Sequence, residues 1–408
     1  MSKVEYKNTL IKDIGRVVTG KTPKTKKAEF YGNGYMFITP AELHDGYNVQ
    51  VSDKYITESG LQSIKSNCID GTSVMVGCIG WDMGNVAICH RKCATNQQIN
   101  SITDFNPKYN PFYTYYWLLT KKDYLFTIAS VTRTPILSKS TFEEIVIPMP
   151  DRSIQDNVVG TLKPIDDMME NNKRICSELE AMAKTLYDYW FVQFDFPDEN
   201  GKPYRTSGGE MVWNKQLKRK IPKEWKPGKL CDIANITMGQ SPAGESYNDA
   251  GDGLFFYQGR TDFGLRFSTP RMYTTAPTRF AQKGDILLSV RAPVGDLNFA
   301  MEDCCIGRGL AALNSKLGSQ MHLFYTLAGF QQIFKVMDEN GTTFGSITKD
   351  RLFDMSVVIP PDEILMCFEK LVKPIESKIE KCEEEIRELT KLRDWLLPML
   401  MNGQARVE

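Results

Sequence analysis

The stretch Leu162-Lys163-Pro164-Ile165 recurs 210 residues later as Val372-Lys373-Pro374-Ile375. From each copy a series of mostly apolar side chains continues in alternating steps of four and three residues. The first series is Ile165, Met169, Asn172, Cys176, Leu179, Ala183, Leu186 and Trp190, and the second is Ile375, Ile379, Cys382, Ile386, Leu389, Arg393, Leu396 and Leu400. This spacing is a heptad seam, so the repeat predicts two long helices that pair as a coiled coil.

The sequence alone allows more than one interpretation of these apolar stripes and of the prolines within them. A single apolar stripe more often faces the core of its own domain, but a matched pair at one offset favours helix pairing. Pro164 and Pro374 mark either a kink or the start of each long helix. Asn172 is a candidate register-fixing residue, because an unpaired buried amide penalises misaligned pairings.

The repeat extends beyond the helices and divides the chain. Gly20-Lys21-Thr22-Pro23 matches Gly239-Gln240-Ser241-Pro242, and the apolar-proline run 145–150 matches 356–361 just ahead of each helix. Strand-like runs at 72–76 and 285–290 and helix-like runs at 112–119 and 322–327 predict two similar α+β domains. The predicted boundaries are 1–150 for the first domain, 151–196 for the first helix, 197–222 for a turn-rich connector, 223–361 for the second domain and 362–408 for the second helix.

Composition narrows the class of protein. The 408 residues are 42% hydrophobic and 25% charged, which is ordinary for a globular chain of two or more domains. No apolar run approaches the ~20 residues of a membrane span, and ten scattered cysteines without a secretory leader predict reduced thiols in the cytoplasm. The net charge is zero, so a nucleic-acid partner must be argued from local clusters.

The sequence patterns that resemble a nucleotide site or a metal site are each incomplete. Residues 15–22 fit the pattern of a phosphate-binding P-loop, but Pro23 and a run of lysines follow where a helix is needed. In the second copy Ala234 and Gln240 replace the first glycine and the lysine. The cysteines at 89, 93, 304 and 305 have no second pair at zinc-site spacing. We therefore predict a non-catalytic chain without a metal or cofactor of its own.

Polar and basic loops on the two domains are the remaining candidates for function. The residues concerned are Lys21, Thr22, Lys24, Lys26, Asn96, Gln97 and Gln98 in the first domain, and Gln240, Ser241, Arg260, Arg291 and Arg308 in the second. Lysines suit phosphates, arginine forks suit guanine, and asparagine or glutamine amides suit adenine. An ordinary solvated surface is the alternative interpretation.

The order of these pieces resembles the specificity subunit of type I restriction–modification systems. The residues that carry the resemblance are 171–175 (Asn-Asn-Lys-Arg-Ile), 179–183 (Leu-Glu-Ala-Met-Ala) and 186–195 (Leu-Tyr-Asp-Tyr-Trp-Phe-Val-Gln-Phe-Asp). Residues 341–349 (Gly-Thr-Thr-Phe-Gly-Ser-Ile-Thr-Lys) look like the family's loop ahead of the last strand, whereas the first copy, 130–139, lacks the glycine. The likeness covers nearly the whole chain.

The resemblance implies a function that composition does not. Each recognition domain is expected to read one half of a split double-stranded DNA target, and Arg133, Thr342 and Thr343 join the candidate DNA contacts. The helices are expected to pair antiparallel and to set the unread spacer. The seam from Ile165 to Trp190 is about 39 Å long at ~1.5 Å per residue, close to the ~34–36 Å of one DNA turn.

By the same resemblance, methylation and cleavage belong to other subunits. Two methyltransferase subunits and a translocating restriction subunit are the expected partners, and S-adenosylmethionine, ATP and Mg would bind to them. Tyr187, Tyr189, Trp190 and Phe191 are either part of the methyltransferase dock or buried against the following domain. The alternative function is a non-catalytic coiled-coil adaptor whose duplicated domains bind protein.

Overall fold

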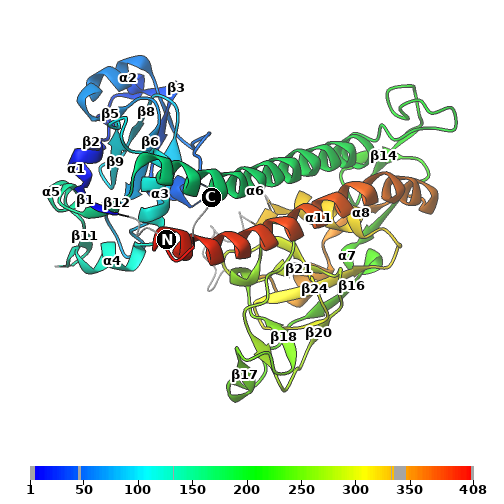
Figure 1. Cartoon of the computed structure of the whole chain (residues 1–408). Coiled ribbons are helices and arrows are strands. Elements are labelled where there is room, and N and C mark those ends of the chain that lie inside the picture. The colour runs from blue at the N-terminus through cyan, green and yellow to red at the C-terminus, as the bar shows by residue number, and fades with distance from the viewer. Residues whose placement is uncertain (1–4, 45–46, 132, 332, 335–345, 406–408) are drawn as a thin grey trace. The chain divides into compact units, whose positions relative to one another are not determined.

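The computed structural model describes residues 5–44, 47–131, 133–331, 333–334 and 346–405 of the chain (Figure 1). The chain divides into two compact units, unit 1 from residues 1–171 and 387–408 and unit 2 from residues 172–386. The division cuts both long helices, so each unit contains a globular part and a segment of each helix. The predicted α+β class, with two similar mixed units and long helices, is confirmed.

The described part of unit 1 contains two four-stranded sheets and two separate strand pairs, β1–β12 and β10–β11. Its strands are β1 (Lys7–Leu10), β2 (Arg16–Thr19), β3 (Tyr31–Ile38), β4 (Tyr55–Ile56), β5 (Cys68–Ile69), β6 (Ser73–Gly77), β7 (Val86–Cys89), β8 (Cys93–Thr95), β9 (Ile99–Thr103), β10 (Ser130–Val131), β11 (Pro135–Ile136) and β12 (Val146–Met149). Its short helices are α1 (Ile11–Ile14), α2 (Glu58–Ser63), α3 (Pro111–Leu119), α4 (Lys122–Thr127) and α5 (Lys139–Glu143).

Unit 2 repeats this plan after a connecting hairpin. Its strands are β13 (Met211–Asn214), β14 (Arg219–Pro222), β15 (Lys226–Lys229), β16 (Ala234–Met238), β17 (Tyr247–Asn248), β18 (Leu254–Tyr257), β19 (Tyr273–Thr274), β20 (Phe280–Ala281), β21 (Ile286–Ser289), β22 (Leu297–Phe299), β23 (Cys304–Ile306), β24 (Leu310–Ser315) and β25 (Ser356–Ile359). Its short helices are α7 (Leu230–Ile233), α8 (Gln320–Gly329) and α10 (Lys349–Phe353).

The sheet topology of the two units is equivalent. An antiparallel sheet of order β2-β9-β6-β7 in unit 1 corresponds to β16-β24-β21-β22 in unit 2. A second sheet has one parallel pair in each unit, β3 with β8 and β18 with β23. The strand pairs β1–β12 and β15–β25 close the two units. All residues of β6 and β21 are buried, which explains why both segments read as continuous apolar runs.

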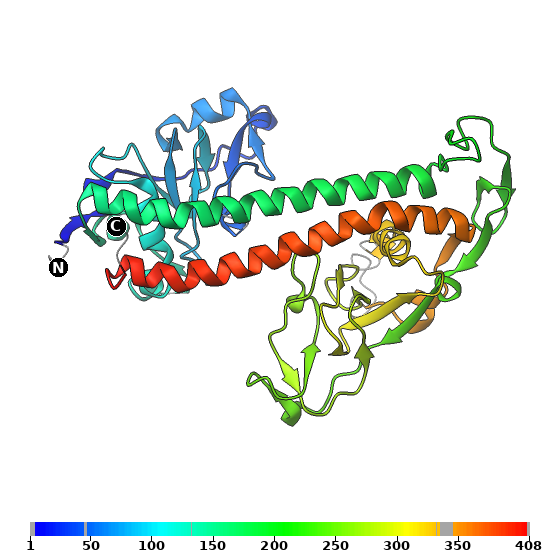
Figure 2. The same ribbon diagram turned by 45° about the vertical axis from the view of Figure 1, so that its right-hand side comes forward.

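The two long helices are continuous, as Figure 2 shows. α6 (Arg152–Tyr187) passes into a π-helical turn, Asp188–Val192, and α11 spans Asp362–Met401. Pro164 and Pro374 therefore lie inside the helices, and the interpretation that they mark the helix starts is wrong. The real starts follow directly on β12 and β25, where Pro150 and Pro361 stand just ahead of the first turn.

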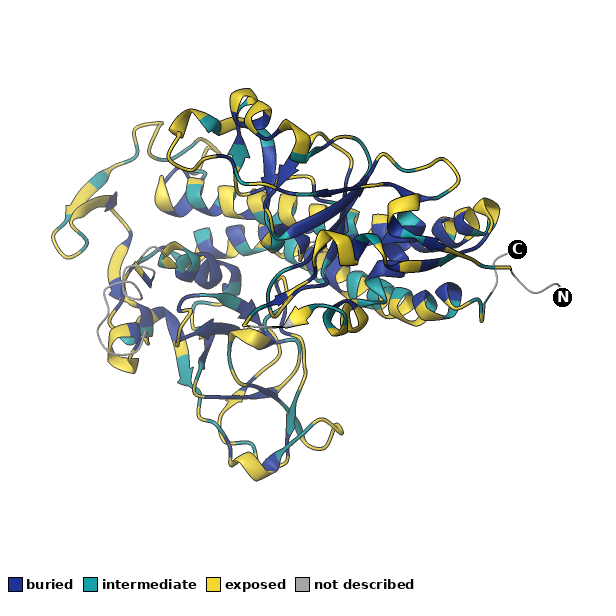
Figure 3. Cartoon of the chain, turned by 90° about the vertical axis from the view of Figure 1, so that its left-hand side faces the viewer, coloured by how far each residue is buried: buried dark blue, intermediate teal, exposed yellow. Residues whose placement is uncertain are grey.

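The predicted seams are the packed sides of these helices. All the seam positions lie in the described part of the chain, and none of them is exposed. Figure 3 shows buried and exposed segments alternating along the long helices. In unit 1, Met169 of α6 contacts Thr390 of α11 through Sδ and Oγ1 at 3.2 Å, and Asp166 contacts Arg393 at 3.3 Å. Rising numbers on α6 thus meet falling numbers on α11, so the segments run antiparallel. In unit 2, Cys176 packs on the Ile379 carbonyl.

A buried polar cluster ties the helix segments of unit 1 to its globular part. Asp166 of α6 is 1% exposed and accepts a hydrogen bond from the Tyr116 hydroxyl of α3 at 2.7 Å. Arg393 of α11 pairs with the same carboxylate. Burial raises the pKa of the Asp166 carboxyl, although Tyr116 and Arg393 oppose that rise. The cluster therefore holds α3, α6 and α11 together.

Unit 2 has an equivalent cluster with a different source of positive charge. Arg266, in the loop after β18, is 5% exposed and reaches Glu376 of α11 through Nε at 3.2 Å and Nη2 at 3.1 Å. Its guanidinium also lies 3.7 Å from Glu180 of α6 and 3.8 Å above the Phe324 ring. Burial acts to lower the pKa of Arg266, but Glu376 and its neighbours outweigh burial and raise it.

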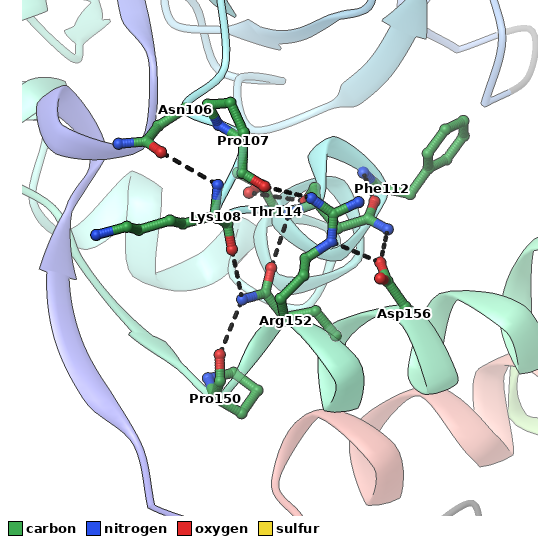
Figure 4. Close-up of polar contacts among 10 residues, drawn as sticks. Asn106, Pro107, Lys108, Phe112, Thr114, Pro150, Arg152 and Asp156 are labelled. Carbon is green, nitrogen blue, oxygen red and sulfur yellow. Dashed lines mark hydrogen bonds and ion pairs between the residues drawn. The ribbon is translucent and has the colours of Figure 1, made fainter.

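The first turns of α6 are fastened to the loop ahead of α3 (Figure 4). Gln155 is 1% exposed and accepts a hydrogen bond from the backbone N–H of Asn110 at 2.8 Å. Asp156 accepts from Asn110 Nδ2 at 2.7 Å and from Arg152 Nε at 2.8 Å. Because Asn110 also caps α3 through the N–H of Phe112, the network fixes the start of α3 against α6.

Candidate nucleic-acid interface

In each unit the loops at one end of the four-stranded sheet carry most of the candidate DNA contacts. Antiparallel pairing brings the ends of β2 and β6 beside the starts of β9 and β7, and likewise β16 and β21 beside β24 and β22. We call these loops the loop edge. It consists of residues 20–27, 78–85 and 96–98 in unit 1, and of residues 239–243, 290–296 and 307–309 in unit 2.

A glycine starts the first loop of each edge, because the backbone of another loop passes against it. A Cβ atom on Gly20 would clash with the carbonyl oxygen of Asn96, and one on Gly239 would clash with that of Gly307. The same glycines donate equivalent backbone hydrogen bonds, Gly20 to Ile99 at 3.0 Å and Gly239 to Leu310 at 2.9 Å. Gly20, which belongs to the rejected P-loop pattern, and its counterpart Gly239 therefore serve close loop packing.

A tyrosine fixes the proline of each first loop. The Tyr31 hydroxyl donates to the Pro23 carbonyl at 2.8 Å, and the Tyr247 hydroxyl donates to the Pro242 carbonyl at 3.0 Å. Neither tyrosine was predicted from the sequence, although each lies at a short distance after the matched Gly-x-Ser/Thr-Pro motif. The two loop edges therefore share one backbone framework.

The amides of unit 1 are partly committed to this framework. Asn96 is 9% exposed, its Nδ2 donates to Gln98 Oε1 at 2.9 Å, and its Oδ1 accepts from the Gln98 N–H at 3.0 Å. Thr22 Oγ1 donates to Gln97 Oε1 at 2.7 Å. Gln97 itself is exposed, so of the three predicted amides it is the one best placed to reach a base.

The other two loops of this edge carry exposed cations and an exposed aromatic ring. Lys21, Lys24 and Lys26 are exposed, and within the described ranges none of them has an ion pair. Trp81, which the sequence reasoning missed, is 71% exposed and lies 6.0 Å from the ring of Phe126. Its sequence signal is a tryptophan between two glycines just after a buried strand, where no core periodicity accounts for it.

The β10–β11 hairpin adds Arg133 to the edge of unit 1. The Gly80 N–H donates to the Pro135 carbonyl at 3.0 Å, and the Leu137 N–H donates to the Cys78 carbonyl at 2.9 Å. Arg133 is exposed near the turn of this hairpin. Thr342 and Thr343, the residues expected at the corresponding place in unit 2, lie outside the described residues.

The loop edge of unit 2 is rich in arginine. Arg291 and Arg308 are exposed and, in the part of the chain that the structure describes, neither has an ion pair. Arg308 also donates its backbone N–H to Ser241 Oγ at 3.3 Å, which places it beside the first loop. Arg260 instead forms an ion pair with Asp296, so part of its charge is neutralised. Gln240 is exposed, and its carbonyl accepts from the Thr278 hydroxyl at 2.5 Å.

A cleft of about 1090 Å³ opens beside this edge within unit 2. Its walls come from α6, α8 and residues 258–266 and 291–297. Lys184, Arg260 and Arg291 bring positive charge to the lining, and Glu180 and Asp296 bring negative charge. The cleft therefore brings a face of α6 next to the arginines of the loop edge.

Three of the four aromatic residues considered for partner docking are buried. Tyr187, Trp190 and Phe191 are 9%, 5% and 4% exposed and pack into the core of unit 2, around Phe368. Burial against the following domain is thus the correct interpretation for these three, and Tyr189 alone remains exposed, at 39%. Asn172 is 7% exposed, and its Nδ2 has no hydrogen-bond partner among the described residues.

Neither a metal centre nor a membrane span is found in the described part of the chain. The thiols of Cys89 and Cys93 are buried with their sulfur atoms 3.7 Å apart. Among the described residues no group of three or more histidine, cysteine, aspartate or glutamate side chains is placed to hold a metal ion. Of the helices described, none combines the length and apolar character needed to cross a bilayer.

Comparison with known proteins agrees with this geometry. The model of the type I restriction modification DNA specificity domain matches residues 3–181 and 222–387. The chain is 29% identical over 417 residues to the type I restriction enzyme MjaIX specificity subunit of Methanocaldococcus jannaschii, covering 98% of this chain and 93% of that one. It is 30% identical over 338 residues to the HindI specificity subunit of Haemophilus influenzae, covering 68% of this chain and 74% of that one.

A solved structure shares the fold. The crystal structure of the type I restriction-modification system S subunit from M. genitalium has a TM-score of 0.59 to this chain at 17% sequence identity. The match covers 98% of this chain and 97% of that one.

Proposed function

Because the chain belongs to the family of type I restriction modification DNA specificity domains, we propose that each of its two units reads one half of a split DNA target. The chain is a non-catalytic specificity subunit that supplies DNA recognition to a restriction–modification complex. The proposal concerns how it recognises DNA: through the loop edge of each unit, with an unread spacer between the two half-sites.

One observation carries the proposal: the two loop edges have the same backbone framework but different exposed side chains. A glycine and a tyrosine–proline hydrogen bond recur in both units. Gln97 and Arg308 occupy the same place in the two frameworks, since each follows the buried strand β8 or β23 by two residues. A domain duplicated in order to read two different base sequences needs this combination of constant scaffold and variable readers.

The chemistry assigns different contacts to the two edges. In unit 1, Lys21, Lys24 and Lys26 bind phosphates and Gln97 reaches a base edge, with Arg133 and Trp81 beside them. In unit 2, Arg291 and Arg308 offer guanidinium forks that suit guanine O6 and N7. The two half-sites therefore differ in sequence.

Methylation and cleavage of DNA would require partner subunits. The chain acts with DNA and with the other subunits of a restriction–modification complex. We propose that two methyltransferase subunits and a translocating restriction subunit bind it, and that S-adenosylmethionine, ATP and Mg bind to those subunits. The long helices would then set the length of the unread spacer, and the complex would act in the cytoplasm, where the DNA lies.

Mapping methylated adenines in cells that carry the system tests the proposal. We expect a motif of two short, different sequences separated by a spacer of fixed length. Replacing residues 223–361 by the corresponding part of a relative should change one half of the motif and leave the other half and the spacer unchanged. A continuous motif, or a replacement that alters both halves, would contradict the proposal.

A further inference from the structure

The connector between α6 and the globular part of unit 2 carries a basic hairpin that neither loop edge explains. β13 and β14 pair antiparallel, with Trp213 opposite Lys220 and Val212 opposite Ile221. Between residues 211 and 223 the chain has five basic residues and no acidic one. Residues 182–221 also lie outside both stretches matched by the family model, so the hairpin is not part of the matched domains.

The hairpin is anchored at its base. Ile221 is 1% exposed and belongs to the core of unit 2. The Arg219 guanidinium lies 5.2 Å above the Phe194 ring, and Lys223 pairs with Glu210 at 2.7 Å. Two of the five basic residues are thus engaged by the unit itself, and they hold the hairpin in a defined conformation.

The remaining basic residues face solvent. Lys215, Lys218 and Lys220 are exposed, and in the described ranges none of the three has an ion pair. Side chains directly opposite in an antiparallel pair lie on the same face, so Lys220 stands beside Trp213, which is 61% exposed. The tip and one face of the hairpin therefore combine three free ammonium groups with an uncovered indole.

We propose that this hairpin binds the phosphate backbone of duplex DNA and forms a sequence-independent contact outside the two loop edges. Lysine is depleted in protein–protein interfaces but is a common phosphate ligand, because neutralising phosphates releases condensed counterions. The absence of acidic residues between 211 and 223 leaves the attraction undiminished. The indole supplies an apolar surface against sugars and bases, as aromatic side chains do in nucleic-acid sites.

The test removes only the free charges and leaves the anchored residues intact. In the full chain we replace Lys215, Lys218 and Lys220 by glutamine and measure the affinity for a random-sequence duplex at several salt concentrations. Three lost phosphate contacts should lower the slope of log K against log salt by about 2–3, at ~0.9 per phosphate. Affinity at low salt should fall at least about tenfold, and the ratio of target to random affinity should stay constant.

A matched control removes the same charge elsewhere in unit 2. Lys373, Lys378 and Lys381 of α11 are exposed, and their replacement by glutamine should change the slope much less. An equal change in both variants would show an effect of net charge and overturn the proposal. An unchanged slope with reduced co-purification of a methyltransferase subunit would overturn it in favour of a protein partner. Trp213→Ala should weaken binding with little change in slope, and full affinity in that variant would remove the indole from the site. The half-site proposal would survive any of these failures, because it is read from the methylation motif.

Discussion

Unit 1 and unit 2 present different exposed side chains on one backbone framework. Gly20 and Gly239 start equivalent loops against equivalent backbone, yet the exposed residue beyond the neighbouring strand is Gln97 in unit 1 and Arg308 in unit 2. The positions that hold the loops in place are buried or bonded to backbone, whereas Gln97 and Arg308 are exposed. The backbone framework and the side chains proposed to read DNA can therefore change independently, as the proposed reading of two different half-sites requires.

The two units also differ in the ion pairs and hydrogen bonds that join their globular parts to the long helices. In unit 1 the Tyr116 hydroxyl of α3 donates to the Asp166 carboxylate, which also pairs with Arg393 of α11. In unit 2 Arg266 of the globular part donates to the Tyr325 hydroxyl of α8 and pairs with Glu376 of α11. Arg266, a residue of the globular part of unit 2, thus contacts both helix segments of that unit, through Glu180 of α6 and Glu376 of α11. Unit 1 relies on a helix-to-helix ion pair, which its tyrosine then joins.

Substitutions that remove these buried ion pairs are expected to have the largest effect, on the free energy of unfolding. Arg266→Ala leaves the Glu376 carboxylate, 17% exposed, without its bidentate partner and removes the cation above Phe324. We expect it to lower the free energy of unfolding of unit 2 by about 3–5 kcal/mol. Arg393→Ala should cost less, because the Tyr116 hydroxyl still donates to Asp166 and burial already raises the pKa of that carboxyl, so it can take up a proton. Urea denaturation of both variants checks this order, and equal losses would contradict it.

This difference also shows what the sequence could and could not predict. The heptad seams and the Gly-x-Ser/Thr-Pro repeat depend on local spacing, so the long helices and the matching loops were predictable. Arg266 finds Glu376 across more than a hundred residues, and no local pattern marks that pairing. Trp81 and the β13–β14 hairpin were missed for the same reason, because solvent exposure is set by the tertiary fold. Tyr187 was ambiguous, since an aromatic run serves a core and an interface equally well.

The second-largest effect concerns the side chains that are proposed to contact bases in each unit. Arg291→Ala and Arg308→Ala should each relax specificity at positions of one half-site only, by about 1–3 kcal/mol per lost base contact. Gln97→Ala should do the same in the other half-site. Binding to a panel of single-base variants of the methylation motif measures both. Loss spread across the two half-sites would mean that these residues do not read bases separately.

A pH effect should distinguish the cores of the units. The third residue of α3 is Tyr113, and the third residue of α8 is His322, which is buried between aromatic rings. Burial lowers the pKa of His322 to about 3, against about 6.5 in the unfolded chain. The unfolded state therefore binds more protons between these values. Stability from His322 is complete above pH 6.5 and declines as the pH falls towards 3.

At pH 5 this difference amounts to about 2 kcal/mol. His322→Phe keeps an aromatic ring beside Phe191 and removes the titrating group. The variant should therefore lose less stability than the parent chain between pH 7 and pH 5. Denaturation followed by the fluorescence of Trp190 and Trp225, both in the core of unit 2, measures the change. Parallel pH curves for the two proteins would mean that His322 is hydrated in the folded state.

The smallest effect concerns phosphates. Lys24 and Lys26 are exposed in the first loop of unit 1, and the matched positions in unit 2 are Ala243 and Glu245. Lys24→Ala and Lys26→Ala should weaken target and random DNA alike and lower the salt slope by about 1 each. Lys27→Ala serves as the control, because its ammonium lies 3.2 Å from the Glu29 carboxylate and is already compensated.

The reciprocal change, Glu245→Lys in unit 2, should raise the slope if the shared scaffold presents this loop to DNA in both units. A slope that falls in unit 1 but does not rise in unit 2 would show that the units place the same loop differently against the duplex.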